Sequence, residues 1–322
     1  MLRYVLRRLL LIIPIILGII FIVFSILEFT PGDPVTIMLG KDATPELVAI
    51  KRAEFGLDDP FLIRYVNYVL DIVQGDFGTM YASGNSVGEA IRQRFVVTLE
   101  LALLGIGLSV LVGIPLGIIS AVKKYSLIDI FSILFAMLLS AMPSFWLGLM
   151  LILVFAVRLR WFPAFGIGDG LRSMILPCIT LSAAYTAVIV RMTRSCMLEV
   201  ISQDYVRTAR SKGANEWRII IKHALRNAMM PVLTTVGMYF GALMGGAVIA
   251  ETVFSLPGLG TLLVSGITAK DTPTVLGCVT VIATSISLIN LAVDVIYAYL
   301  DPRIKAQYAS MGFLKMKARK KK

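Results

Sequence analysis

The chain has 322 residues, of which 57% are hydrophobic and 16% charged, and it carries a net charge of +11. Its mean hydropathy of +0.84 excludes an ordinary soluble domain and is typical of a protein that crosses a membrane several times. The 31 Lys and Arg residues lie between or at the ends of apolar runs. Because the chain has no basic patch with interleaved aromatic side chains, we expect no nucleic-acid binding.

Six stretches are apolar and close to the length of about 20 residues that a helix needs to cross a hydrocarbon core. We therefore expect an all-α polytopic membrane protein whose six transmembrane helices are 9–29, 96–121, 128–157, 174–192, 231–254 and 275–300. The first stretch is too long for the apolar part of a signal peptide and no A-x-A site follows it, which indicates a retained anchor. The third is long and contains Pro143, which predicts a kink or a tilt.

The positive charges predict the orientation. One side of a six-span chain holds both termini, loop 122–127 and segment 191–230, with 21 Lys and Arg residues, whereas the other side holds 10. Six of those 10 lie in the long loop 30–95, and long loops cross the membrane regardless of their charge. The comparison is then 21 against 4. We expect both termini and segment 191–230 in the cytoplasm.

These spans predict the organisation of the chain. The expected parts are a cytoplasmic N-terminus at 1–8, a first span at 9–29, an extracytoplasmic loop at 30–95, a core of five spans at 96–300, a cytoplasmic loop at 193–230 within that core, and a basic cytoplasmic tail at 301–322. The tail ends in FLKMKARKKK, which favours attraction to anionic lipid. Segment 255–274 is rich in Gly and Pro, and we expect it to dip into the membrane only where protein or water satisfies its backbone.

The polar segment between the fourth and fifth spans has the pattern of a helical hairpin. Between Asp204 and Arg226 it holds six Lys or Arg residues and two Asp or Glu residues. The pattern predicts a helix, a break at Gly213 and a second helix that places four apolar residues on one stripe, namely Trp217, Ile221, Ala224 and Leu225. An apolar stripe backed by charge suits docking into a groove on another protein, and it also suits lying flat on a lipid surface.

Small residues at helical spacing occur in two spans. Gly113-xxx-Gly117 lies in the second and Gly241-xxx-Gly245 in the fifth. Such pairs allow two helices to approach closely. We favour packing within this chain over a subunit interface, because pairs of this kind are common in multispan proteins.

Residues for catalysis or metal binding are not assembled in the sequence. His223 is the only histidine, and the three cysteines (Cys178, Cys196 and Cys278) are far apart without C-x-x-C spacing, which predicts small buried hydrophobic residues. The only Gly-Lys pair, Gly40-Lys41, is followed by Asp42, so the chain has no P-loop. We therefore expect no catalytic residue, metal or cofactor in this chain, and no enzyme activity of its own.

Asp294 is the clearest ionisable residue within a span. Insertion of a charge at a helix centre costs about 2.5–3.5 kcal/mol. We favour structural pairing of Asp294 with Arg303 over a role in translocation. Glu28, Glu100 and Glu251 lie at span ends. A proton-coupled transporter usually shows more buried carboxylates, or two similar halves with interrupted helices, and the sequence shows neither.

The chain resembles the first permease subunit of ATP-binding-cassette importers for dipeptides, oligopeptides and nickel. The resemblance runs nearly end to end and rests on motifs in the family's order, which are YVLRRLLLIIP…PGDP at 4–34, GLDDP at 56–60, GDFGT at 75–79, MPSFWLGL at 142–149, DYVRTARSKG…HALRNA at 204–228, GGAVIAETVFSLPGLG at 245–260 and NLAVDVIYAYLDPRI at 290–304. It implies that loop 30–95 caps the outer mouth and helps to receive a solute-binding protein. Four aromatic residues there are available for packing, namely Phe61, Tyr65, Tyr68 and Phe77.

The resemblance also implies a coupling helix in the cytoplasmic loop. Permeases of the wider superfamily carry an EAA-x3-G signature there, which docks on the ATPase subunit. The corresponding residues here are Arg207-Thr208-Ala209 and Gly213, so only Ala209 and Gly213 match. The later I-x-L-P element reads His223-Ala224-Leu225-Arg226 and keeps only Leu225. These departures are those of the peptide and nickel branch.

The resemblance assigns two groups of site residues. Those expected to couple the chain to an ATPase are Asp204, Tyr205, Arg207, Thr208, Ala209, Arg210, Lys212, Gly213, Trp217, His223, Leu225 and Arg226. Candidates for the translocation path are Met142, Ser144, Met244 and Glu251. The implied partners are a second, similar permease, two cytoplasmic ATP-binding subunits that hold ATP and Mg²⁺, an extracytoplasmic solute-binding protein and membrane lipid.

Alternatives remain for both the cargo and the protein class. The same assembly would also suit a nickel chelate, glutathione or another small solute. Other classes are a stand-alone secondary transporter or channel, an intramembrane enzyme, and a membrane anchor whose cytoplasmic segment rests on lipid. Transport by the purified chain without ATP would indicate the first of these three classes, and facing catalytic groups within the membrane would indicate the second.

Overall fold

The computed structural model describes the backbone of residues 2–40 and 43–300 and the side chains of residues 5–40 and 43–296. Within these ranges the regular structure is helical, and the β-type pairing is an isolated bridge between Thr79 and Ser86. The predicted basic tail at 301–322 lies outside the described residues. The all-α prediction is confirmed for the part of the chain that the structure describes.

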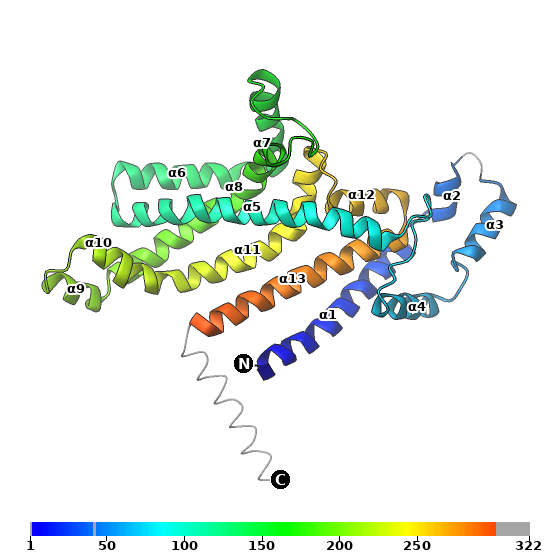
Figure 1. Ribbon diagram of the computed structural model, residues 1–322, viewed down its shortest axis with the longest axis horizontal. Helices are drawn as coiled ribbons and strands as arrows, with labels where there is room; N and C mark the ends of the chain where they lie inside the picture. Colours follow the sequence, from blue (N-terminus) through cyan, green and yellow to red (C-terminus); the bar gives the residue numbers. More distant parts are fainter. Residues whose placement is uncertain (1, 41–42, 301–322) are drawn as a thin grey trace, which may run out of the picture.

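Five helical runs among the described residues are long and apolar enough to cross a membrane. They run side by side along the length of the molecule (Figure 1) and comprise α1 (Leu2–Phe29), α5 (Val87–Val122), α8 (Leu171–Ile201), α11 (Arg226–Val253) together with the short helices that precede it, and α13 (Thr272–Leu300). Each contains one of the stretches predicted to span, because a run of about 20 apolar residues is stable in lipid only as a helix.

The predicted third span is broken rather than kinked. It consists of α6 (Leu127–Ala141), α7 (Ser144–Leu151) and the π-helix η2 (Ile152–Arg158), and its two parts are bent by 101°. Met142 is extended, with φ −79° and ψ 126°. A residue that precedes proline is disfavoured in the helical region. Met142, which precedes Pro143, therefore does not continue α6, and the helix ends at Ala141. Consequently α7 projects sideways from the bundle (Figure 1).

A cap and a hairpin lie at opposite ends of the bundle (Figure 1). The cap, residues 30–86, contains α2 (Pro34–Leu39), α3 (Pro45–Glu54) and α4 (Phe61–Val73). The hairpin, residues 204–226, contains α9 (Asp204–Ser211), α10 (Glu216–Arg218) and the π-helix η3 (Ile219–Leu225). A further short helix, α12 (Leu259–Ala269), lies at the cap end between α11 and α13.

Local sequence explains where the helices of the cap begin. Asp33 accepts a hydrogen bond from the amide of Thr36, and Pro34 opens α2. Thr44 and Pro45 begin α3 in the same way. A side-chain acceptor followed by proline suits a helix start, because the first amides of a helix have no internal partner. Three of the predicted aromatic residues, Phe61, Tyr65 and Tyr68, attach α4 to a cluster around Ile20 and Phe24 of α1.

Glycine allows α5 and α8 to pack closely in the centre of the bundle. A Cβ atom at Gly113 would lie 2.7 Å from Ile189, and one at Gly117 would lie 2.6 Å from Thr193. Gly241 of α11 similarly faces Ile286 and Asn290 of α13. The prediction that both small-residue pairs pack within this chain is therefore confirmed.

Asp294 forms an ion pair with a residue of another helix, and its predicted pair with Arg303 stays a prediction. Arg303 lies outside the described residues, and Arg8 of α1 forms an ion pair with Asp294 at 3.0 Å. The observed pairing of Asp294 connects the first and last long helices of the structure. An arginine from a neighbouring helix lowers the cost of a carboxylate in an apolar span in the same way as an arginine on the same helix.

Candidate functional site

The hairpin turns at Gly213, as predicted. Gly213 has φ +76°, a conformation that glycine adopts without the steric cost of a Cβ atom. Its amide donates to the carbonyl of Arg210 at 2.9 Å, and the amide of Ala214 donates to the carbonyl of Ala209 at 3.2 Å. These bonds satisfy the last carbonyls of α9, which is the usual way in which a helix ends at a left-handed residue.

Polar contacts close the turn from both sides. The guanidinium of Arg210 forms a two-pronged ion pair with Glu216, with Nε to Oε1 at 2.7 Å and Nη2 to Oε2 at 3.2 Å. Asn215 begins the second arm, because its Oδ1 accepts from the amide of Trp217 at 2.9 Å. Planar two-pronged pairs fix geometry as well as charge. The hairpin therefore has a defined shape rather than that of a loose loop.

Apolar contacts attach the hairpin to the bundle. Val206 of α9 and Ile219 of η3 are both fully buried. Ile220 and Ala224 pack in a cluster that also contains Met197 of α8 and Ala121 of α5. In addition, Asn227 Nδ2 donates to the hydroxyl of Tyr205 at 2.8 Å, which connects α9 to the first turn of α11. A movement of the hairpin would therefore displace its contacts with three long helices, α5, α8 and α11.

The apolar stripe predicted for the second arm is only partly correct. The side chains of Trp217 and Ile221 are exposed, with 72% and 41% of their surface accessible, but Ala224 is buried and Leu225 is half-buried. Residues 219–225 form a π-helix, whose wider turn changes the rotation per residue. The 3.6-residue spacing therefore does not keep all four side chains on one face.

The structure brings the twelve predicted coupling residues together in one hairpin. Ala209 and His223 are half-buried, whereas Trp217 and the charged residues are exposed, the latter being Asp204, Arg207, Arg210, Lys212 and Arg226. Exposed aromatic and basic side chains surround a turn that is fixed by the Arg210–Glu216 ion pair and by apolar contacts with the bundle. Such a surface is chemically suited to a groove on another protein, where an aromatic anchor is buried and the surrounding charges determine register.

The four path candidates fall into two pairs. Met142 and Ser144 are half-buried at the break between α6 and α7. Met244 and Glu251 are fully buried within α11, so neither faces an open path in this conformation. Lining of the path by these residues stays a prediction.

A buried carboxylate holds the first turn of α12. Glu251 accepts hydrogen bonds from Thr98 Oγ1 at 2.6 Å and from the amide of Thr261 at 3.0 Å. A Cβ atom at Gly258 would lie within 2.4 Å of this carboxylate, so the glycine provides the room for it. A negative charge at a helix N-terminus is stabilised by the free amides and the helix dipole. Glu251 therefore positions α12 on α11.

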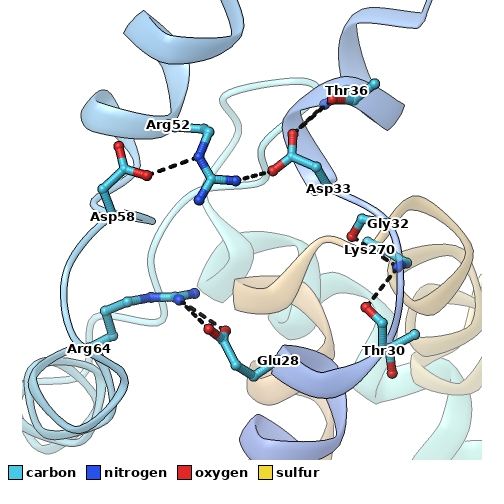
Figure 2. A network of polar contacts seen from close by, with 9 residues as sticks. All are labelled: Glu28, Thr30, Gly32, Asp33, Thr36, Arg52, Asp58, Arg64 and Lys270. Carbon is cyan, nitrogen blue, oxygen red and sulfur yellow. Dashed lines mark hydrogen bonds and ion pairs between the residues drawn. The ribbon is translucent and has the colours of Figure 1, made fainter.

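Ion pairs organise the cap beside α1 and α12 (Figure 2). Arg64 of α4 pairs with Glu28 of α1 at 2.9 Å, and Arg52 of α3 pairs with both Asp33 and Asp58. Lys270, which follows α12, donates to three backbone carbonyls of the cap, those of Thr30, Pro31 and Gly32. These groups surround a cavity of about 660 Å³.

The electrostatics of the cap follow from these contacts. Burial opposes ionisation of Asp33, but hydrogen bonds from Thr36 and the neighbouring Arg52 outweigh it and lower the pKa of Asp33. Burial raises the pKa of Tyr81 to about 12 and also raises the pKa of Asp271. Sequence reasoning did not select Lys270 or Asp271. The available signal was a charged pair in the otherwise uncharged segment 255–274.

Comparisons with known proteins agree with this architecture. Residues 113–306 match the family model described as the inner membrane component of binding-protein-dependent transport systems, and residues 1–102 match its N-terminal companion. The dipeptide transport system permease protein DppB of Alkalihalophilus pseudofirmus is 39% identical over 95% of this chain and all of the relative. DppB of Escherichia coli and the glutathione transport system permease protein GsiC of Salmonella typhimurium are each 41% identical, over 95% of this chain and 99% of the relative.

A solved structure shares the fold. A chain of the MetNI methionine ABC transporter in an inward-facing conformation superposes with a TM-score of 0.56 at 18% sequence identity, covering 66% of this chain and 96% of that one. At this identity the likeness concerns the fold alone. The family models and the relatives that match over nearly their whole length confirm the family that the motifs indicated. The chain belongs to the inner-membrane components of binding-protein-dependent transport systems.

Proposed function

We propose that the chain is the permease subunit of an ATP-driven importer of di- and oligopeptides, and that the hairpin transmits motion from a separate ATP-binding subunit. The observation that carries the proposal is the exposed surface of Trp217 and Ile221 on a hairpin fixed by Gly213 and by the Arg210–Glu216 ion pair. A rigid element with an unpartnered aromatic face suits docking, and the family requires an energy source that this chain's sequence does not contain. ATP and Mg²⁺ would then be held by the partner subunits.

The geometry supports a lever mechanism. Residues 216–253 are one uninterrupted helical run from the hairpin to the cap end of the bundle. Closure of two ATP-binding subunits would draw the hairpins of two paired permeases together, and this run would carry the displacement through the membrane. The path then opens outward to receive a solute from the solute-binding protein, and hydrolysis resets the assembly. One chain of six spans encloses half a path, which is why we infer a second permease.

The orientation follows from charge. The hairpin end contains the basic segment 191–230, and under the rule that basic loops stay inside it faces the cytoplasm. The cap then faces outward, where it would receive the solute-binding protein. Six spans are counted when α6 and α7–η2 are taken as one broken span.

The relatives support peptides as cargo. Two are named for dipeptide transport. The relative named for glutathione transport is 41% identical to this chain, as is one of the two dipeptide permeases. Glutathione is therefore the second candidate, and both are small molecules with peptide bonds. Uptake of a radiolabelled dipeptide and of radiolabelled glutathione, measured in cells that depend on this chain, would distinguish them.

The docking surface can be tested by changing its exposed aromatic residue. In Trp217→Glu, we expect the chain to reach the membrane in normal amounts, but co-purification of the ATP-binding subunits and dipeptide uptake should fall at least tenfold. Phe165→Glu is a matched control, because Phe165 is also an exposed aromatic residue, with 61% accessible surface, outside the hairpin. Normal association and uptake in Trp217→Glu would contradict the proposal.

Reconstitution of purified subunits in lipid vesicles distinguishes this proposal from a stand-alone transporter. In vesicles that contain this chain and its paired permease, we expect no dipeptide uptake under a proton or sodium gradient. Uptake should begin only when the ATP-binding subunits, ATP and the solute-binding protein are all added. Gradient-driven uptake without ATP would favour a secondary transporter.

A further inference from the structure

The turn between α12 and α13 contacts two separate parts of the cap. Lys270 is left-handed, with φ +52°. Its Nζ donates to the carbonyls of Thr30 at 3.1 Å and Gly32 at 3.0 Å (Figure 2) and also to that of Pro31. The ammonium group thus has three acceptors at the point where the chain leaves α1. A lysine with three oriented donors matches such a cluster.

The next residue holds the other side of the cap. Asp271 is 6% exposed, and its two oxygens accept from the amide of Tyr81 at 3.0 Å and from the amide of Thr274 at 3.2 Å. The ring of Tyr81 stacks on Phe55 at the end of α3, with the ring centroids 4.5 Å apart. Two adjacent residues therefore contact the first residues of the cap and its last turn.

The other end of α12 is fixed to α11. Glu251 of α11 accepts from Thr261 in the first turn of α12, and Thr98 of α5 connects the two by donating to Glu251 at 2.6 Å and accepting from the amide of Leu259 at 2.8 Å. Both ends of an 11-residue helix are thus held by charged hydrogen bonds, which are stronger than neutral ones. The helical run that contains α11 begins in the hairpin.

We propose that Glu251, Lys270 and Asp271 are positioning residues that connect α11 to the cap through α12, so that the position of the cap follows the movement of the hairpin. The inference rests on the proposed function, in which an ATP-binding subunit docks on the hairpin and the solute-binding protein docks on the cap. Because coupling between two sites is reciprocal, docking of the solute-binding protein then changes the ATPase rate through the same three residues.

The direct test measures ATP hydrolysis by the complete importer in nanodiscs. Rates are compared without and with the importer's solute-binding protein, saturated with a tryptone peptide mixture. For Lys270→Met and Asp271→Asn we expect an unchanged basal rate and about a fivefold or greater loss of stimulation, the usual size of allosteric coupling. Lys270→Arg, which keeps a charged donor, should recover part of the stimulation. Glu251→Gln should lower the stimulation ratio as well.

The matched control is Lys51→Met, since Lys51 is a cap lysine whose ion pair is with Glu54 in its own helix. Its stimulation should equal that of the unchanged importer. Wild-type stimulation in Lys270→Met and Asp271→Asn would overturn the inference, as would equal losses of basal and stimulated rates, which indicate a merely structural role. An unchanged importer that assembles with its ATPase but is not stimulated would overturn the inference alone. Failure of the ATP-binding subunits to co-purify would overturn the proposed function and the inference together.

A second measurement does not depend on the solute-binding protein. A non-hydrolysable ATP analogue should change the hydrogen-exchange rate of the amides near Gly32 and Tyr81 in the unchanged importer. In Glu251→Gln that nucleotide-dependent change should disappear, although the amides of the hairpin still respond. Persistence of the response in the cap of Glu251→Gln would overturn the inference.

Discussion

Half-buried Arg194 of α8 and buried Asp129 of α6 form a two-pronged ion pair, with Nε and Nη2 at 2.7 and 2.9 Å from the two carboxylate oxygens. The side chain of Asp129 is 3% exposed and also accepts from Ser120 Oγ at 2.5 Å and from the amide of Tyr125 at 2.9 Å. One carboxylate thus connects α5, α6, α8 and the left-handed turn at Tyr125. Arg194 lies near the end of α8, shortly before the chain enters the hairpin.

Removal of one partner should destabilise the chain strongly. In Arg194→Ala the carboxylate of Asp129 is left buried without its cation, a change that typically costs about 3–5 kcal/mol in the free energy of unfolding. We expect a clearly lower thermal unfolding midpoint of the protein purified in detergent. Arg92→Ala is the control, because Arg92 forms an exposed pair with Glu89 one turn away and should leave the midpoint unchanged. Equal midpoints for the two variants would contradict a structural role of the Arg194–Asp129 pair.

Close packing of α5 on α8 should not tolerate a methyl group at Gly117. A Cβ atom there would lie 2.6 Å from Thr193 and 2.8 Å from the carbonyl of Val190. Because backbone must shift, Gly117→Ala should lower the free energy of unfolding by about 1–3 kcal/mol. Gly107→Ala on the same helix meets nothing within 4 Å and should be neutral or stabilising, since alanine favours helix. Denaturant titrations of the two variants make the comparison, and similar losses would refute the packing argument.

The spans and the hairpin were predictable because their causes are local. Apolar length alone determines that 96–121 and 174–192 are helical, and a glycine between two helical patterns predicts the turn at Gly213. The extent of the break at Pro143 was not predictable, because a proline is compatible with anything from a slight kink to the 101° bend observed. The π-helix of η3 was also missed, since its residues have an ordinary helical pattern.

Contacts between distant residues account for most of what sequence reasoning missed. Lys270 contacts the carbonyl of Thr30 across 240 positions, and Arg194 contacts Asp129 across 65. A single sequence shows charged residues but does not show their partners. Glu251 illustrates the consequence, because the sequence does not show that its carboxylate accepts from Thr261 at the N-terminus of α12.

The cap should loosen in acid through Asp33. Its folded-state pKa is lowered by its partners Thr36 and Arg52, against the effect of burial, so ionised Asp33 stabilises the cap above its unfolded pKa of about 3.9. This contribution is lost as pH falls through the lower, folded-state pKa. We expect hydrogen exchange of the amides within 30–86, corrected for the intrinsic effect of pH on exchange, to accelerate below about pH 4. Asp33→Asn should exchange faster at neutral pH and show a flatter pH dependence. Identical pH profiles for both proteins would contradict this role of Asp33.

Strain at the tip of the hairpin should uncouple transport. At Gly213, φ is +76° and a Cβ atom would meet nothing within 4 Å, so Gly213→Val introduces backbone strain of about 1–2 kcal/mol without a clash. We expect a distorted turn, weaker association of the ATP-binding subunits and fewer peptides imported per ATP hydrolysed. Gly166→Val is the matched control, because Gly166 has φ +74° and equally open surroundings outside both the hairpin and the cap. If both variants import the same number of peptides per ATP, the shape of the hairpin is not what transmits the motion.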